Sequence, residues 1–433
     1  MAKPMHRWTA LALAALLAGC TSASPSLVAP AASATPVTSV EPSASPARGP
    51  DSDLALLLRT LEGTHPEPFH AVSREEFVAA LDAYEVALPS MTPSEAAVEL
   101  MRIWAMLAKE RDGHQFALPA AAADDRILPI RVYEFDGDLY VTDARAPNDD
   151  VAGSRVTAIG GTPTDEVLAL VEPLVPRDGP ATVPTFRPVL LLRAVVLEGL
   201  GVAEPGAPIE LTVEGADGSD RTVSVEPITS DEYDDWAGPF GLFHLPHDAE
   251  VAYLADTESF AVHELDNGRT LYLRYRFVEA PDVSAAEQRI GSGGVDRLFL
   301  DLRQNPGGDN STYGPLLRLA QAFASDHPGA TTVLTDRVTF SAAANLATEI
   351  EQSTDAVFMG EPMGGGLNFW NDVSWITLRT LPIPMRLAVS TRYWQFAAPD
   401  DPRLTIKPDL VFPVTAADYL AGRDPVLDAA LSR

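Results

Sequence analysis

The chain has 433 residues, of which 46% are hydrophobic, and it carries a formal net charge of −30 at pH 7. This length and hydrophobic content allow two or three folded domains and exclude a largely disordered chain. So acidic a surface repels phosphate backbones, which argues against a nucleic-acid partner. The single cysteine, Cys20, excludes an internal disulfide and a thiolate metal cluster.

The first element is a targeting segment. Lys3 and Arg7 precede the apolar run WTALALAALL, which is too short to span a bilayer. The run ends in LAGC, which resembles the bacterial lipobox, where cleavage leaves the cysteine as a lipid-bearing N-terminus. We therefore predict a lipoprotein signal peptide over residues 1–19 and lipidation at Cys20. The alternative is an ordinary signal peptide with a chance cysteine.

Residues 20–50 follow as a tether. Apart from the lipidated cysteine they are mostly Ser, Ala, Thr and Pro with almost no charge, a composition that cannot build a core. No later segment is apolar and long enough to be a membrane span. We expect a bacterial cell-envelope protein, anchored by its lipid on the extracytoplasmic side, in the periplasm or at the cell surface.

Residues 51–126 are predicted to form an N-terminal helical domain. Apolar residues recur there at spacings of three and four. Ser73 with Glu76, and Thr92 with Glu95, have the spacing of N-terminal capping boxes.

A β-rich domain is predicted over residues 127–228. It contains a hairpin around Asp136-Gly137 and a second hairpin in PIELTVEGADGSDRTVSVEP. A helical stretch at about 186–203 interrupts the strands. Residues 229–250, rich in Asp, Gly and Pro, are predicted to be a linker.

From residue 251 to 433, strands and helices alternate. After a hairpin on Asn267-Gly268, continuous apolar strands lead into glycine-rich loops and helices, which favours a parallel sheet covered by helices. Such sheets carry reactive groups on loops at the carboxyl ends of their strands. Two loops have this position, DLRQNPGGDNS at 301–311 and TDRVTFSAAANLA at 335–347.

Ser341 lies where the second of these loops becomes a helix. A residue there is close to free backbone N–H groups and to the positive end of the helix dipole. The three alanines that follow would let a substrate approach the backbone. This arrangement suits an attacking hydroxyl, and the alternative is a serine that only caps the helix.

Several segments in fixed order resemble one family. LFLDLRQNPGG resembles the strand-and-turn signature of the C-terminal-processing and tricorn-type serine peptidases. DRVTFSAAANLA, GEPMGGG and IKPDLVFPVTAADYLAGRDPVLDAAL are similar to segments that follow it there. GSRVTAIGGTPTDEVLALV is similar to the family's PDZ-like insert, and THPEPF and RDGH resemble the N-terminal region of its tricorn-like branch. The resemblance covers most of residues 51–433.

The resemblance implies an α/β multidomain chain. Its core would be Clp-protease/crotonase-like, at 251–433, joined to an N-terminal helical region and a PDZ-like β-rich domain. It also implies catalytic roles: Ser341 as nucleophile, His114 of RDGH as general base, and Asp401 as the carboxylate that orients the base. Asp400 is the rival for that last role, and either aspartate could instead cap a turn.

The resemblance further implies an oxyanion hole built from the backbone N–H groups of Gly307 or Gly308 and of Ala342. One branch of the family uses a Ser–Lys dyad instead. Gly366 stands where that lysine would be, and the lysines beyond the signal peptide, Lys109 and Lys407, lie outside this loop. A neutral imidazole is a natural general base, which favours His114.

Three further features bear on the chemistry. HLPH at 244–247 could bind a metal, but no third ligand accompanies it. Ala344 and Gln115 depart from the family's usual glutamate and threonine.

From the resemblance as a whole we expect an exported, tail-specific type of serine endopeptidase with no metal or organic cofactor, acting on a peptide or protein substrate. The alternatives are an inactive peptide-binding lipoprotein and an esterase or amidase using the same triad.

Overall fold

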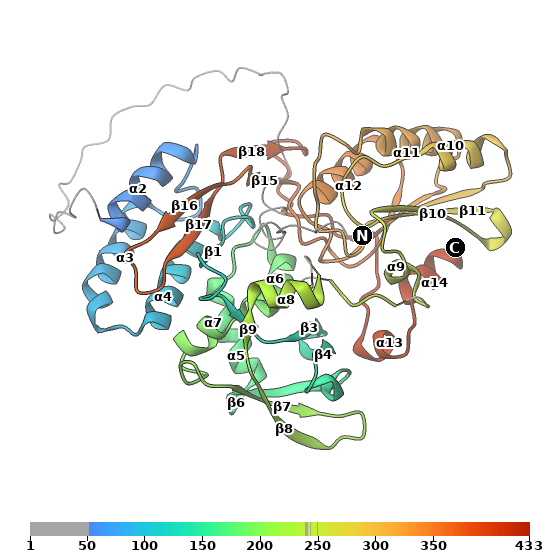
Figure 1. The fold of residues 1–433 in the computed structure, drawn as a ribbon. Helices are drawn as coiled ribbons and strands as arrows, with labels where there is room; N and C mark the ends of the chain where they lie inside the picture. Colours follow the sequence, from blue (N-terminus) through green and yellow to red (C-terminus); the bar gives the residue numbers. More distant parts are fainter. Residues whose placement is uncertain (1–51, 239–240, 243, 249) are drawn as a thin grey trace, which may run out of the picture.

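The computed structural model describes residues 52–433 except 239–240, 243 and 249 (Figure 1). The predicted signal peptide, the lipidation site Cys20 and the tether lie outside the described residues. Among the described residues, none of the helices has the length and apolar character needed to cross a membrane.

The core is a six-stranded sheet with the order β10-β11-β12-β13-β14-β19. From β11 to β19 neighbouring strands pair in parallel, and β10 is an antiparallel edge. The predicted hairpin and parallel strands are thus confirmed. The strand bounds are β10 Phe260–Leu265, β11 Thr270–Tyr275, β12 Arg297–Asp301, β13 Thr331–Thr335, β14 Val357–Gly360 and β19 Leu410–Val411.

Helices cover both faces of this sheet (Figure 1). On one face, apolar residues of the strands pack with those of α11 and α12, and with Ala286 of α10. On the other, Tyr272, Phe299 and Met359 pack with α14. This burial explains why the strands are apolar throughout. The bounds are α10 Ser284–Gly291, α11 Gly314–Asp326, α12 Ala342–Ser353 and α14 Pro425–Leu431, with short helices α9 Ala252–Ala255 and α13 Ala416–Leu420 nearby in sequence.

The N-terminal region is helical, as predicted. Both predicted capping boxes are present, with the Ser73 and Thr92 side chains accepting from the backbone of Glu76 and Glu95. The helices are α2 Asp53–Thr64, α3 Arg74–Ala87 and α4 Pro93–Ala105.

The β-rich region forms a second sheet, with the order β3-β4-β5-β7-β8 and β6 paired to β5. Both predicted hairpins are present in it. Its strands are β3 Ile130–Phe135, β4 Asp138–Ala144, β5 Arg155–Ile159, β6 Thr162–Pro163, β7 Ile209–Glu214 and β8 Asp220–Val225. Its helices are α5 Thr164–Val171, α6 Val183–Leu191 and α7 Ala194–Gly199. The segment after β8 contains strand β9 Ile228–Thr229 and helix α8 Ser230–Ala237. Strand β9 pairs with β2 Arg126–Ile127.

One feature was not predicted: a segment from the C-terminal half completes the N-terminal region. Strand β1 pairs with β17, and β17 with β16, in a three-stranded sheet (Figure 1). Beside it, β15 and β18 form a two-stranded ribbon. The backbone N–H of Trp370 in β15 donates to the carbonyl of Arg111 at 2.7 Å. The RDGH turn is therefore fastened to the second half of the chain. The bounds are β1 Ala117–Pro119, β15 Asn368–Asn371, β16 Ser374–Leu378, β17 Met385–Val389 and β18 Arg392–Gln395.

Candidate functional site

Ser341 lies in the connection from β13 to α12 and has a strained backbone. Its φ is 51° and its ψ is −126°, a conformation that a residue with a Cβ adopts only at a cost. Within the described residues its side chain makes no hydrogen bond that caps the helix. Helix capping therefore does not explain this serine. A strained serine on a strand-to-helix turn is the arrangement that exposes a nucleophilic hydroxyl in other hydrolases.

The NPGG turn packs directly against Ser341. A Cβ on Gly307 would lie 2.6 Å from the Ser341 Cβ and 3.0 Å from the Ala342 nitrogen, so only glycine fits. The Gly307 N–H donates to the Asn305 side chain at 2.9 Å and is not available to a substrate. The N–H groups of Gly308 and Ala342 donate to no acceptor among the described residues. Of the three predicted oxyanion donors, Gly308 and Ala342 therefore have available N–H groups, whereas that of Gly307 is used by Asn305.

Hydrogen bonds hold the loops at 301–311 and 335–347 together. The Asp336 carboxylate accepts from the backbone N–H of Gln304 at 3.0 Å and from its side chain at 2.6 Å. The Phe340 N–H donates to the carbonyl of Asn305 at 3.0 Å. The hydroxyl of Thr339 donates to the carbonyl of Leu302 at 2.9 Å. The donors around Ser341 are therefore preorganised, which is what stabilisation of an oxyanion requires.

His114 is fully buried beside this loop. Its ring lies between Phe340, at 4.7 Å between ring centroids, and Phe369, at 5.4 Å. Neither ring nitrogen has a hydrogen-bond partner among the residues that the structure describes, Ser341 included. Burial lowers the pKa of His114 to about 3. The predicted base thus packs against Phe340, the residue before Ser341, and is neutral at pH 7.

The neutral, buried His114 leads to a prediction about acid stability. The pKa of histidine in an unfolded chain is about 6.5, so the contribution of His114 to stability is complete above that pH. It is lost as the pH falls from about 6.5 towards 3. Between pH 7 and pH 5 we expect the wild-type protein to lose about 2 kcal/mol more unfolding free energy than a His114→Gln variant. Urea unfolding at both pH values measures this, and equal acid sensitivity of the two proteins would contradict it.

The predicted orienting carboxylate, Asp401, makes no hydrogen bond to His114 among the described residues. The Asp401 carboxylate accepts from the Arg403 guanidinium at 2.8 Å, and these hydrogen bonds lower the pKa of Asp401. Asp400 is exposed. Asp401 forms an ion pair with Arg403, two residues away, and its role as the orienting carboxylate stays a prediction, as does that of Asp400.

A different aspartate, Asp178, contacts the His114 loop. It is fully buried and accepts from the backbone N–H of Gly113 at 2.6 Å and of Gly366 at 3.0 Å. Burial raises the pKa of Asp178 to about 7, although both backbone donors act in the opposite direction. Asp178 therefore joins the RDGH turn to the glycine loop. No motif surrounds it in the sequence, so sequence reasoning missed it.

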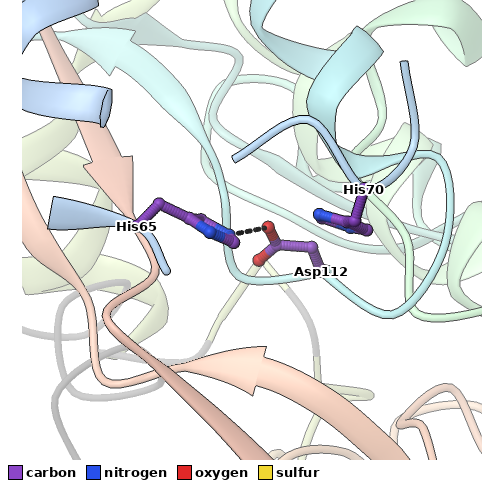
Figure 2. A group of neighbouring side chains, drawn as sticks. All are labelled: His65, His70 and Asp112. Carbon is purple, nitrogen blue, oxygen red and sulfur yellow. Dashed lines mark hydrogen bonds and ion pairs between the residues drawn. The ribbon is translucent and has the colours of Figure 1, made fainter. Parts of the chain in front are cut away.

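Asp112, also in the RDGH turn, is held by two donors. The His65 Nδ1 atom accepts from the backbone N–H of Glu67 at 3.0 Å, so the ring proton resides on Nε2. That Nε2–H donates to Asp112 at 3.2 Å (Figure 2), and the hydroxyl of Ser390 donates to the other carboxylate oxygen at 2.6 Å. The turn that carries His114 is thus held at Asp112 from two other chain segments, one at His65 and one at Ser390.

His65, His70 and Asp112 are close enough to be considered as a metal site (Figure 2). The hydrogen bonds oppose this assignment. The lone pair of His65 Nδ1 is used by Glu67, and its Nε2 carries a proton. Both ring nitrogens of His70 face carbonyl oxygens, at 3.0 Å for Glu67 and 3.3 Å for Glu110. A metal-ligating nitrogen needs a free lone pair. The two histidines therefore suit hydrogen bonding within the protein better than metal binding.

Comparison with known proteins gives similarity of fold. No family model and no curated protein matches the sequence. Among solved structures, mature CPAF complexed with lactacystin is similar at 14% identity and a TM-score of 0.57, over 86% of this chain and 94% of that chain. A mutant of CPAF has a TM-score of 0.59 at the same identity and coverage. The predicted α/β core with a helical and a β-rich region is confirmed, and the chain shares this fold with CPAF.

Proposed function

We propose that the chain is an exported serine peptidase that hydrolyses peptide bonds through an acyl-enzyme on Ser341. The observation that carries the proposal is the strained Ser341, whose hydroxyl caps no helix among the described residues, beside two available backbone N–H groups. The shared fold with CPAF and the sequence resemblance to tricorn-like peptidases support it.

The chemistry assigns one role to each group. The Ser341 Oγ attacks the carbonyl carbon of the scissile bond while His114 accepts its proton. The N–H groups of Gly308 and Ala342 stabilise the oxyanion. His114 then gives the proton to the leaving amine, and water, deprotonated by His114, hydrolyses the acyl-enzyme.

This reaction requires a hydrogen bond between Ser341 and His114 that the described residues do not form. Catalytic hydrogen bonds are often long or absent before substrate binds. We expect substrate to displace the packing of His114 between Phe340 and Phe369 and to bring the ring to the hydroxyl.

The surroundings of the site complete the proposal. A lipid on Cys20 and the tether of residues 20–50 would hold the enzyme on the extracytoplasmic side of a bacterial membrane. Its substrates would be peptides or proteins there. The β-rich region, PDZ-like by sequence, would present a chain end to the site.

A second candidate is a peptide-binding protein without catalysis. It is favoured by the burial of both Ser341 and His114 and by the missing hydrogen bond between them. An esterase or amidase with the same groups is the third.

A hydrolysis assay separates these candidates. Peptide libraries and a small activated ester are incubated with the wild-type protein and with Ser341→Ala and His114→Ala variants. Ser311→Ala is the matched control, since Ser311 is an exposed serine in the loop after the NPGG turn. The proposal expects peptide cleavage by the wild type and the control only. Cleavage of the ester alone would indicate an esterase. Peptide binding by the wild type without cleavage, retained in Ser341→Ala, would indicate a binding protein.

A further inference from the structure

A cavity of about 430 Å³ lies away from Ser341, between the β-rich region and the core sheet. It is at the carboxyl end of β11, and β3 provides part of its wall. Its polar lining includes Arg131, Arg276, His244, His247, Thr257 and Ser259. Cavities of this size accommodate small molecules or the end of a peptide.

Arg276 is the unusual member of this lining. In the described part of the chain, no carboxylate oxygen lies within ion-pair distance of its guanidinium. It makes two long contacts, 3.4 Å to the carbonyl of Asp256 and 3.4 Å to the ring of His244. Burial lowers the pKa of Arg276, and the charges of Arg274 and Arg131 lower it further. A cation is therefore held beside other cations, and the charge of the more distant Asp256 carboxylate acts in the opposite direction.

The remaining charges around the cavity neutralise Arg276 only in part. Arg131 is itself buried; its guanidinium donates to the carbonyls of Gly241 and His244 and forms a long ion pair with Asp143 at 4.0 Å. The carboxylate of Asp256 is paired with His263 at 2.8 Å. Glu258 lines the cavity but is exposed. The cavity is thus positive in a chain whose net charge is −30.

We propose that this cavity binds a small anionic ligand, with a carboxylate or phosphate group held by the Arg276 guanidinium. The planar guanidinium fork matches both groups, and the hydroxyls of Thr257 and Ser259 offer further donors. The same arginines oppose the cation that the HLPH stretch could have suggested. This inference does not depend on the peptidase proposal.

The cavity is also connected to the catalytic turn. Two residues after Arg276, the N–H of Val278 donates to the carbonyl of Gly307 at 2.8 Å. The N–H of Asp309 returns a hydrogen bond to the Val278 carbonyl at 2.8 Å. An anion on Arg276 would therefore bind to the strand end that supports the NPGG turn.

Calorimetry and thermal unfolding test the proposal at constant ionic strength. The probes are inorganic phosphate, N-acetyl-alanine, which has a free carboxylate, and N-acetyl-alaninamide, which does not. The variants are Arg276→Gln and, as a matched control for charge, Arg221→Gln, whose arginine is exposed and paired with Asp150. Arg276→Lys keeps the charge but not the fork, and it replaces Arg276→Gln if that variant does not fold.

We expect saturable binding of phosphate or N-acetyl-alanine by the wild type and by Arg221→Gln, with none of the amide. Arg276→Gln or Arg276→Lys should weaken that binding at least about tenfold, which corresponds to about 1.4 kcal/mol. Preference for one probe identifies the ligand as a carboxylate or a phosphate. Absence of saturable binding in the wild type, or equal affinity in the wild type and the Arg276 variant, would overturn the proposal.

Discussion

Replacing Ser341 with glycine is expected to abolish peptide hydrolysis and to raise the free energy of unfolding by about 1 kcal/mol. Hydrolysis should fall by at least about 10⁴-fold because the nucleophile is removed. Stability should rise because glycine adopts a φ of 51° without the clash that a Cβ causes there. This gain exceeds the entropic cost of adding a glycine to the unfolded chain.

Ser341→Ala is the matched control for this experiment. Alanine removes the hydroxyl but keeps the Cβ, so activity should be lost while the strain and the stability stay close to wild type. Urea unfolding of the three proteins and a peptide assay measure both quantities. If the glycine variant is less stable than the alanine variant, the strain at Ser341 does not exist and the main argument for a nucleophile fails.

Replacing Arg303 with methionine is expected to lower the free energy of unfolding by about 3–5 kcal/mol. Arg303 is buried, and its guanidinium donates to Asp301 at 2.6 Å and to Asp424 at 2.7 Å. Burial would raise the pKa of Asp301, but Arg303 outweighs it and holds that pKa below its usual value. Without the arginine, both carboxylates lose their cation. The guanidinium fork of Arg303 is thus used by two carboxylates of the chain itself.

Arg403 provides the matched control, because it also binds two carboxylates, Asp401 and Glu351, but its side chain is 46% exposed. Arg403→Met should change the free energy of unfolding by no more than about 1 kcal/mol, since water screens exposed pairs. Chemical denaturation of both variants gives the comparison. Similar losses in the two would show that burial does not control the strength of these pairs.

The sequence predicted those parts of the fold that local signals determine. Both capping boxes and all three hairpins depend on residues a few positions apart, and each is present. The strand–loop–helix around Ser341 was predicted for the same reason. The packing of His114 against Phe340, the residue before Ser341, joins segments separated by more than half of the chain and has no local pattern in the sequence.

What the sequence did not predict depends on contacts between distant segments. The pairing of β1 with β17 has no signature in either strand. Asp178 is significant only because Gly113 and Gly366 both point their N–H groups at it. Motif position also does not reveal that Arg403 binds the carboxylate of Asp401. The predicted lipid anchor lies on residues outside the described part of the chain and stays a prediction.

The most direct test of a reactive hydroxyl is covalent labelling. The purified protein is treated with a fluorophosphonate, and the modified residue is mapped by mass spectrometry in the wild type, in His114→Ala and in Ser311→Ala. We predict a single adduct on Ser341 in the wild type and in Ser311→Ala, and none in His114→Ala. A folded wild-type protein that takes up no label at Ser341, or labelling of Ser341 that persists undiminished without His114, would contradict the proposed nucleophile and base.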